Sequence, residues 1–288
     1  MSVDLRPMHH VKLLDVLRRS TDYLQKHGVD SPRLSAELLM AHVLEKKRLD
    51  LYLEFGRVLT ESELAHLRQL IQKRGQRIPI QHILGETTFH GLRLFTTPQA
   101  LIPRPETEML VDLALEILHK SAPGLIYDVG TGSGAIALAL ASSLQNPAWR
   151  IIASDSSEEA LTLARKNHTL YPDLNIEWQK ASLLEHATER TVMVVANLPY
   201  LNAEEMRLLS PEAQADPISA LDGGEDGLFW IRTLILQAAH LTQYLLLEVG
   251  AHHVSAVFDL ARQAGFEKVA IHTDLSNCER FIVASREA

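Results

Sequence analysis

Leu125-Ile-Tyr-Asp-Val-Gly-Thr-Gly-Ser-Gly134 joins a strand pattern to a glycine-rich loop. The run 125–129 is mostly apolar and β-forming, which predicts a short buried strand. The run 135–141, which follows the last glycine, contains only alanine, isoleucine and leucine and predicts a helix. Glycines allow a sharp turn and a close approach, and the first N–H groups of a helix lack partners within it. A strand, a glycine loop and a helix start in this order predict a binding site for a polar ligand.

Two kinds of ligand are compatible with this loop. The pattern G-x-G-x-x-A at 130–135 satisfies the loose fingerprint of dinucleotide-binding proteins. The pattern D-x-G-x-G-x-G at 128–134 resembles the first motif of S-adenosylmethionine methyltransferases. Asp128 favours the second ligand, because an acid beside the loop would repel a pyrophosphate and attract the amino group of a methionine. Asp155 ends the next predicted strand and suits the ribose that both ligands carry, so it does not distinguish them.

From residue 125 onwards, strand and helix patterns alternate. Strands are predicted near 125–129, 150–154, 174–178, 191–196, 243–248, 266–272 and 279–284. Helices are predicted near 134–145, 157–170, 203–208, 226–240 and 251–263. This alternation predicts an α/β fold with a doubly wound, seven-stranded sheet.

The N-terminal part of the chain carries only helical patterns. Apolar residues recur near helical spacing over 11–25, Ser31-Pro32 is typical of a helix start, and Thr60-x-x-Glu63 is a capping box. Gly75 is expected to end the last of these helices. A small helical bundle without catalytic side chains is predicted, and we expect it to be a docking module. His9-His10 is expected to be a surface pair rather than a metal site, because adjacent histidines on a helix point apart.

Residues 76–105 have neither pattern. The β-type runs Glu86–His90 and Leu92–Thr96 flank Gly91 and predict a hairpin. The prolines of 101–105 predict an extended segment before the next helix. We expect this stretch to be an ordered linker between two domains.

Composition and charge restrict the class of protein. The chain has 288 residues and a net charge of −8, which argues against non-specific binding of nucleic acid. The charge is uneven: residues 1–75 hold 13 basic and 10 acidic side chains, so the remainder carries −11. Cys278 is the only cysteine, which excludes an intrachain disulfide. The sequence shows no signal peptide and no membrane-spanning run, so a cytoplasmic protein without a membrane partner is expected.

Asn197-Leu-Pro-Tyr200 follows the predicted strand 191–196 directly. Ligands of open α/β sheets bind beyond the carboxyl ends of strands, so Asn197 is expected in the same crevice as the glycine loop. The proline restricts Leu198 and aims its carbonyl. Two acceptors, the Asn197 side-chain oxygen and the Leu198 carbonyl, would then suit the two N–H bonds of an amide or amino group, with Tyr200 as a flat neighbour. Such positioning favours methyl transfer to a planar nitrogen, whose lone pair is delocalised.

With these residues in view, the chain resembles class I methyltransferases that modify amide or exocyclic amino nitrogens. Four further stretches, 79–92, 101–108, 220–228 and 247–250, are similar to the peptide-release-factor glutamine N5-methyltransferases, the HemK/PrmC family. The resemblance implies a cytoplasmic enzyme that uses S-adenosylmethionine to methylate the glutamine in the Gly-Gly-Gln loop of translation release factors. It implies a helical substrate-docking domain (1–75), a linker with a β-hairpin (76–105) and a methyltransferase domain with a Rossmann-like sheet (106–288).

The resemblance also assigns residues, and it implies no metal. The implied cofactor residues are Asp128, Gly130, Thr131, Gly132, Ser133, Gly134, Asp155, Ser182 and Asn197. The implied substrate residues are Phe89, Asn197, Leu198, Pro199 and Tyr200, of which Asn197 and Tyr200 would be catalytic. Two positions depart from the family pattern. Leu198 replaces a usual proline, which restores an N–H and loosens the pocket, and Ala181-Ser182 stands where an acid often lies near the adenine.

Three other functions stay open at this point. An adenine-N6 methyltransferase acting on RNA or DNA is the main alternative, because Asn-Leu-Pro-Tyr also occurs in rRNA adenine dimethyltransferases. Such an enzyme should show a basic cleft, whereas the residues after 75 carry −11. A nicotinamide-dependent oxidoreductase would leave Asn197–Tyr200 without a role, and a non-catalytic binding module would not need an intact crevice.

Overall fold

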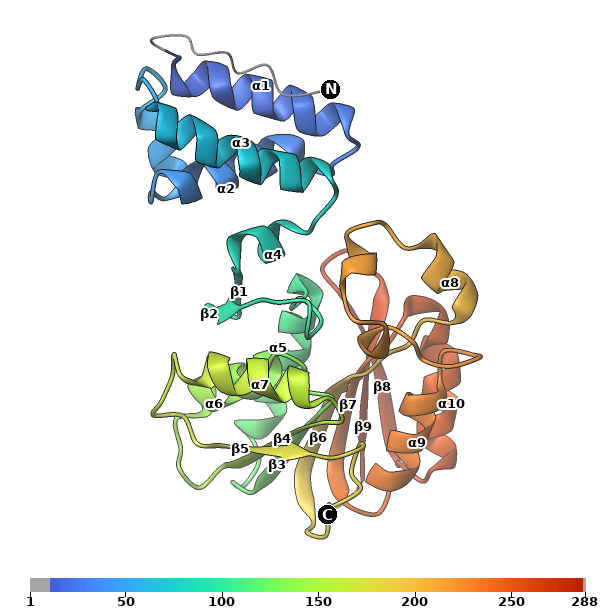
Figure 1. Ribbon diagram of the computed structural model, residues 1–288. Helices are drawn as coiled ribbons and strands as arrows, with labels where there is room; N and C mark the ends of the chain where they lie inside the picture. Colours follow the sequence, from blue (N-terminus) through green and yellow to red (C-terminus); the bar gives the residue numbers. More distant parts are fainter. Residues whose placement is uncertain (1–10, 287–288) are drawn as a thin grey trace. The chain divides into compact units, whose positions relative to one another are not determined.

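The computed structural model describes residues 11–286, which form two compact units (Figure 1). One unit comprises the chain up to Gly85 together with Ser210–Ala215, and the other comprises Glu86–Leu209 and the chain from Asp216 onwards. The boundary at Gly85 falls inside the stretch 76–105, which the sequence analysis expects to be a linker. His9-His10 lies outside the described residues.

The first unit is helical, as predicted. It contains α1 (Leu13–Lys26), α2 (Pro32–Val43), η1 (Arg48–Leu53), α3 (Glu61–Gly75), the unpredicted α4 (Ile80–Leu84) and η2 (Ala213–Ala215). Its core is aliphatic, with Leu17, Leu39 and Leu67 buried together. The capping box is confirmed: Thr60 Oγ1 accepts from the Glu63 N–H, and the Glu63 carboxylate accepts from the Thr60 N–H.

Two expected helix ends differ in this unit. Ser31 precedes α2 but makes no side-chain capping bond, because its backbone is left-handed with φ 49°. Gly75 lies inside the last turn of α3 rather than beyond it. A different contact explains why this residue is a glycine: a Cβ at position 75 would come within 2.7 Å of Cε1 of Tyr23. The ring of a neighbouring helix thus requires the glycine.

Glu212 joins the segment 210–215 to the helical unit. Its carboxylate accepts hydrogen bonds from Arg74 Nη1 at 2.8 Å and from Arg77 Nε and Nη2 at 2.6 and 2.7 Å. Burial alone would raise the pKa of Glu212, but the bonds from Arg77 and Arg74 lower it to about 2. Residues remote in sequence therefore complete this unit through a charge-assisted contact.

The second unit contains the predicted seven-stranded sheet. Its strands are β3 (Leu125–Val129), β4 (Arg150–Asp155), β5 (Ile176–Lys180), β6 (Thr191–Asn197), β7 (Thr242–Glu248), β8 (Lys268–Thr273) and β9 (Glu279–Ser285). The spatial order is β5-β4-β3-β6-β7-β9-β8, and β9 runs antiparallel to both of its neighbours. Since β3 has β4 on one side and β6 on the other, the strand order reverses beside it. Open α/β sheets bind ligands at such a reversal.

Helices cover both faces of this sheet, as Figure 1 shows. On one side lie α5 (Pro105–Leu118), α6 (Ala135–Leu144) and α7 (Glu158–His168), and on the other α9 (Phe229–Ala238) and α10 (Val254–Gln263). Alternate residues of each strand serve the two cores: Ile126 packs with α5 and α6, whereas Tyr127 packs with α9 and α10. The remaining elements are α8 (Ala203–Leu208), η3 (Ile218–Ala220) and η4 (Ala251–His253).

The predicted hairpin is confirmed as β1 (Glu86–Phe89) paired with β2 (Leu92–Phe95). His90 and Gly91 connect the strands, and both have positive φ, 48° and 77°. Two consecutive residues of this kind match the right-handed twist of the strands. Among residues 11–286, no helix is both long enough and apolar enough to cross a membrane.

Candidate functional site

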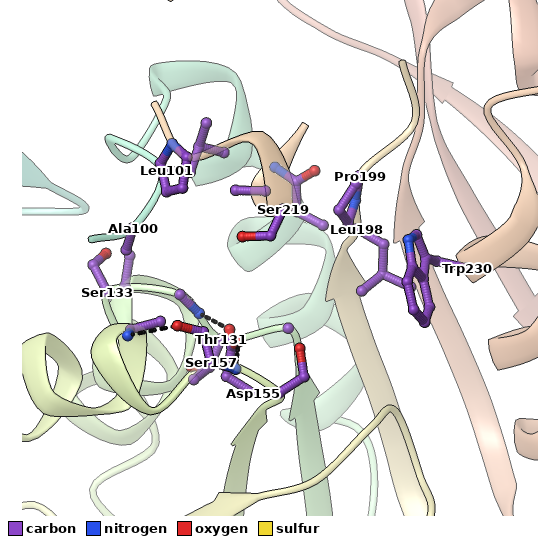
Figure 2. A pocket seen from close by; sticks show the side chains of 18 of the residues that line it. Ala100, Leu101, Thr131, Ser133, Asp155, Ser157, Leu198, Pro199, Ser219 and Trp230 are labelled. Atoms are coloured by element: carbon purple, nitrogen blue, oxygen red, sulfur yellow. Dashed lines mark hydrogen bonds between the residues drawn. The ribbon is translucent and has the colours of Figure 1, made fainter. Parts of the chain in front are cut away.

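A pocket of about 500 Å³ opens beyond the carboxyl ends of β3, β4 and β6 (Figure 2). Residues of the predicted site that line it are Phe89, Gly130, Thr131, Gly132, Ser133, Asp155, Ser182, Asn197, Leu198 and Pro199. Its surface does not include Asp128, Gly134 or Tyr200. The structure thus brings most of the predicted residues together at the strand reversal.

The backbone of the glycine loop is already hydrogen-bonded. The N–H groups of Gly130 and Thr131 donate to the Ser154 carbonyl at 2.9 Å, and the Gly132 N–H donates to Asp155 Oδ2 at 2.9 Å. The Gly134 N–H donates to the Thr131 carbonyl. These four N–H groups are therefore not available as donors to a pyrophosphate.

Asp128 supports the glycine loop from behind and does not line the pocket. Its side chain is fully buried, and Oδ2 accepts from Thr131 Oγ1 at 2.6 Å and from the Ala137 N–H at 3.0 Å. Burial raises the pKa of Asp128 to about 7, against the effect of both bonds. Oδ2 thus holds the loop against α6, whereas Oδ1 has no hydrogen-bond partner among the described residues, and the expected contact of Asp128 with a ligand stays a prediction.

Asp155 ends β4 and lines the pocket, as predicted. Oδ1 accepts from the Ser157 N–H and Oδ2 from the Gly132 N–H, both at 2.9 Å. Burial raises the pKa of this carboxyl group, and the backbone bonds oppose that shift. Each oxygen keeps a second lone pair, so the fixed carboxylate can accept two further hydroxyl donors.

Ala181, Ser182 and Leu183 form the wall beyond β5. Ala181 and Leu183 are buried, and Leu183 has φ 53°. Ala181 N–H donates to the Asp155 carbonyl at 3.1 Å, which ties this wall to the end of β4. The wall offers apolar contact and backbone groups, as expected where the family often has an acid.

Asn197 lies at the end of β6, beside the glycine loop. Its Nδ2 donates to Thr107 Oγ1, 3.1 Å away in the first turn of α5. The next side chain, Leu198, is buried and lies directly over Gly130: a Cβ on that glycine would come within 2.7 Å of Leu198 Cδ2. The leucine that departs from the family pattern thus packs on the loop.

Tyr200 lies outside the pocket surface, so the flat face expected for the ligand is not exposed there. Its carbonyl oxygen lies 3.0 Å from His253 Nε2, and its ring packs against the core shared with α9 and α10. Gly223 and Gly227 approach it so closely that a Cβ on either would meet backbone atoms within 2.8 Å. The loop 220–228 therefore supports the Asn-Leu-Pro-Tyr turn.

Glu248 is a buried acid beside Asn197 that the sequence analysis gave no role. It is 3% exposed and lies level with Asn197 on the adjacent strand β7. Burial raises its pKa to about 7, against hydrogen bonds from Thr107 and Asn197 and the positive charge of Arg280. Its strand position, directly opposite Asn197 in register, was the signal that could have identified it.

Two segments that the sequence did not connect form the outer walls. Asp216 accepts from the Ile102 N–H at 3.1 Å and from Arg104 Nη2, so it binds the segment 100–104 to the segment 217–220. Both segments line the pocket, together with Phe229 and Trp230. Figure 2 shows Leu101, Ser219 and Trp230 around the same space.

Two domain families and several known proteins are similar to this chain. The PrmC N-terminal domain family matches residues 15–85, and a methyltransferase domain family matches 126–214. A release factor glutamine methyltransferase of Deinococcus radiodurans is 37% identical, covering 96% of this chain and 99% of its own length. One of Vibrio cholerae is 36% identical, covering 92% and 93%. The hMettl16 catalytic domain, solved with MAT2A 3′UTR hairpin 6, has TM-score 0.56 at 17% identity, covering 80% and 84%, which shows a shared fold.

Proposed function

We propose roles for individual residues on the premise that this chain belongs to the family of release factor glutamine methyltransferases. The chain is an S-adenosylmethionine-dependent enzyme that methylates the side-chain amide nitrogen, N5, of a release factor glutamine. The target we expect is the glutamine of the Gly-Gly-Gln loop. One observation carries the assignment: Asn197 and Leu198 lie on the pocket that the glycine loop and Asp155 also line.

The pocket fits S-adenosylmethionine better than a dinucleotide. Asp155 is held by two backbone N–H groups and can accept the ribose hydroxyls, while Ala181–Leu183 offers a surface for a flat base. Gly132 has φ 56°, and a Cβ there would meet only Ala100 Cβ at 3.9 Å, so the bare backbone permits a close ligand approach. When bound, S-adenosylmethionine supplies a methyl group on a positively charged sulfur, which is an electrophile.

The chain's contribution to the reaction is to hold and polarise the substrate amide. The Asn197 side-chain oxygen accepts one N–H of the glutamine amide, and the Leu198 carbonyl accepts the other. Amide resonance withdraws the nitrogen lone pair, and two acceptors on its N–H bonds return density to nitrogen. Fixing the nitrogen in one orientation supplies the rest of the effect, because geometry alone can lower such a barrier strongly.

A release factor fits the charge of the chain better than a nucleic acid does. Residues after 75 carry −11, which would repel a phosphate backbone, and no stable nucleic-acid complex is expected. The helical unit is the proposed docking module, with Arg18 and Arg19 exposed on α1. Charge reversal of both arginines should raise KM for the release factor and leave KM for S-adenosylmethionine unchanged. A cytoplasmic location goes with this substrate.

The decisive experiment uses S-adenosylmethionine with a labelled methyl group. The purified enzyme is offered a release factor, ribosomal RNA and DNA in parallel, and the label is located by mass spectrometry. Label on the glutamine of the Gly-Gly-Gln loop supports the assignment. A release factor whose glutamine is replaced by asparagine is the matched control. Label on adenine N6 with none on the release factor would refute it.

A further inference from the structure

We infer that Glu248, acting through Thr107, fixes the side-chain amide of Asn197 so that its oxygen faces the substrate. Thr107 and Glu248 would thus be positioning residues, and this inference rests on the proposed function of Asn197. Asn197 and Glu248 are partners on adjacent parallel strands at the pocket end of the sheet. Thr107 approaches the same point from the first turn of α5.

The hydrogen-bonding capacity of the three side chains permits one arrangement. An ionised carboxylate only accepts, whereas a threonine hydroxyl has one proton to donate. Thr107 is hydrogen-bonded to Glu248, so its proton is used there and its oxygen is left to accept. The atom of Asn197 that lies 3.1 Å from Thr107 Oγ1 must then be the NH₂ group. The amide oxygen is directed to the other side, where Asn197 lines the pocket.

The arrangement matters because an asparagine amide has two nearly isosteric orientations. With the NH₂ group toward the pocket, Asn197 would present donors to a substrate amide that also offers donors, and the hydrogen bond could not form. Asn197 also hydrogen-bonds to the Glu248 carboxylate, whose Oε2 has no partner among the described side chains, so both N–H bonds of the Asn197 amide are directed toward Thr107 and Glu248. A buried acid that would otherwise be costly is explained by this task.

Protonation of Glu248 should release the amide. A neutral carboxyl group can donate to Thr107, which frees the hydroxyl proton to face the Asn197 oxygen. The charged and titratable groups around Glu248 are Arg280 on β9, Glu106 on α5 and Tyr200 beyond β6. Arg280 favours the ionised acid and Glu106 opposes it, while burial is the largest influence and places the pKa at about 7. The rate of methyl transfer should therefore fall as the pH decreases through this region.

The test compares Thr107→Val, Thr107→Ser and Glu248→Gln in the full-length enzyme. Thr107→Val keeps the shape and removes the hydroxyl, so kcat on release factor should fall about 10–100-fold while KM for S-adenosylmethionine stays unchanged. Thr107→Ser should restore most of the rate. Glu248→Gln should lower kcat and flatten its pH dependence, whereas Glu116→Gln, an exposed change on α5, should match wild type.

The outcomes separate this inference from the proposed function. If wild type methylates the release factor and Thr107→Val retains full kcat, the positioning role is refuted while the function stands. A serine variant as slow as the valine variant would also refute it, because serine keeps the hydroxyl. The loss in both variants would then come from a changed side-chain shape and not from the missing hydrogen bond. If wild type leaves the release factor unmodified, the proposed function itself fails. Melting temperatures near wild type for all variants exclude misfolding as the cause of a loss.

Discussion

Replacement of Asn197 by alanine removes the proposed acceptor of one substrate N–H. The loss can be estimated by analogy with an oxyanion-hole donor, whose removal lowers kcat by about 10²–10³, or about 2.7–4 kcal/mol. The upper part of this range is expected here, because Asn197 is only partly exposed and its Nδ2 is held by Thr107 at 3.1 Å. The Leu198 carbonyl remains, so binding of the substrate should fall less than the rate of transfer.

The fold should survive this change. Asn197→Ala deprives Thr107 of one hydrogen bond, and a typical bond of this kind contributes about 0.5–1.5 kcal/mol to stability. Binding of S-adenosylmethionine should be nearly unchanged, since Asp155 and the glycine loop are untouched. A fall in kcat without a comparable rise in the cofactor dissociation constant would identify Asn197 as a residue of the transfer step.

The assay is a single-turnover measurement on release factor with saturating S-adenosylmethionine. Asn175→Ala, an exposed asparagine before β5, is the matched control and should behave as wild type. Calorimetry with S-adenosylmethionine on both variants checks the binding site independently. If Asn197→Ala transfers methyl groups at close to the wild-type rate, the proposed role of the two acceptors is wrong.

Three further changes test other parts of the site and the fold. Asp155→Ala should weaken S-adenosylmethionine binding by about 1.5–3 kcal/mol, measured by calorimetry, and an unchanged affinity would remove Asp155 from the site. Gly130→Ala should lower the free energy of unfolding by about 1–3 kcal/mol in urea, because φ is 71° and Leu198 occupies the space; full stability would refute this packing. Glu212 has a pKa of about 2 against an ordinary 4.5, so its ionised form stabilises the fold above pH 4.5 and that contribution is lost toward pH 2. Glu212→Gln should remove roughly 3 kcal/mol of this pH-dependent stability. The measurement is the difference in free energy of unfolding between wild type and variant, and a difference that is the same at pH 6 and pH 3 would contradict the prediction.

The sequence was informative where chemistry and chain position coincide. Gly130, Asp155 and Asn197 each follow a strand directly, and parallel strands bring such residues to one edge of the sheet without further information. The seven strands of the sheet and the hairpin could be predicted because their sequence patterns are local. The family resemblance added Phe89, and the structure brings this residue to the pocket.

Residues whose role depends on long-range packing were harder to assign. The sequence did not show that Asp128 is completely buried on β3 and that its Oδ2 accepts from the Ala137 N–H of α6. Glu248 gained a role only when β7 was aligned with β6. Asp216 connects two pocket walls through contacts that span more than a hundred positions, and no local pattern encodes such a contact.

The membership of Ser210–Ala215 in the helical unit has a consequence for synthesis of the chain. The unit's helices up to α4 emerge first, but the carboxylate that binds Arg74 and Arg77 belongs to Glu212. All seven sheet strands follow α4 in the chain, and four of them, β3 to β6, precede Glu212. During translation, the ion pairs of Glu212 with Arg74 and Arg77 can therefore form only after most of the sheet strands have been synthesised. Because the chain passes between the units at three places, a single proteolytic cut cannot release either unit intact.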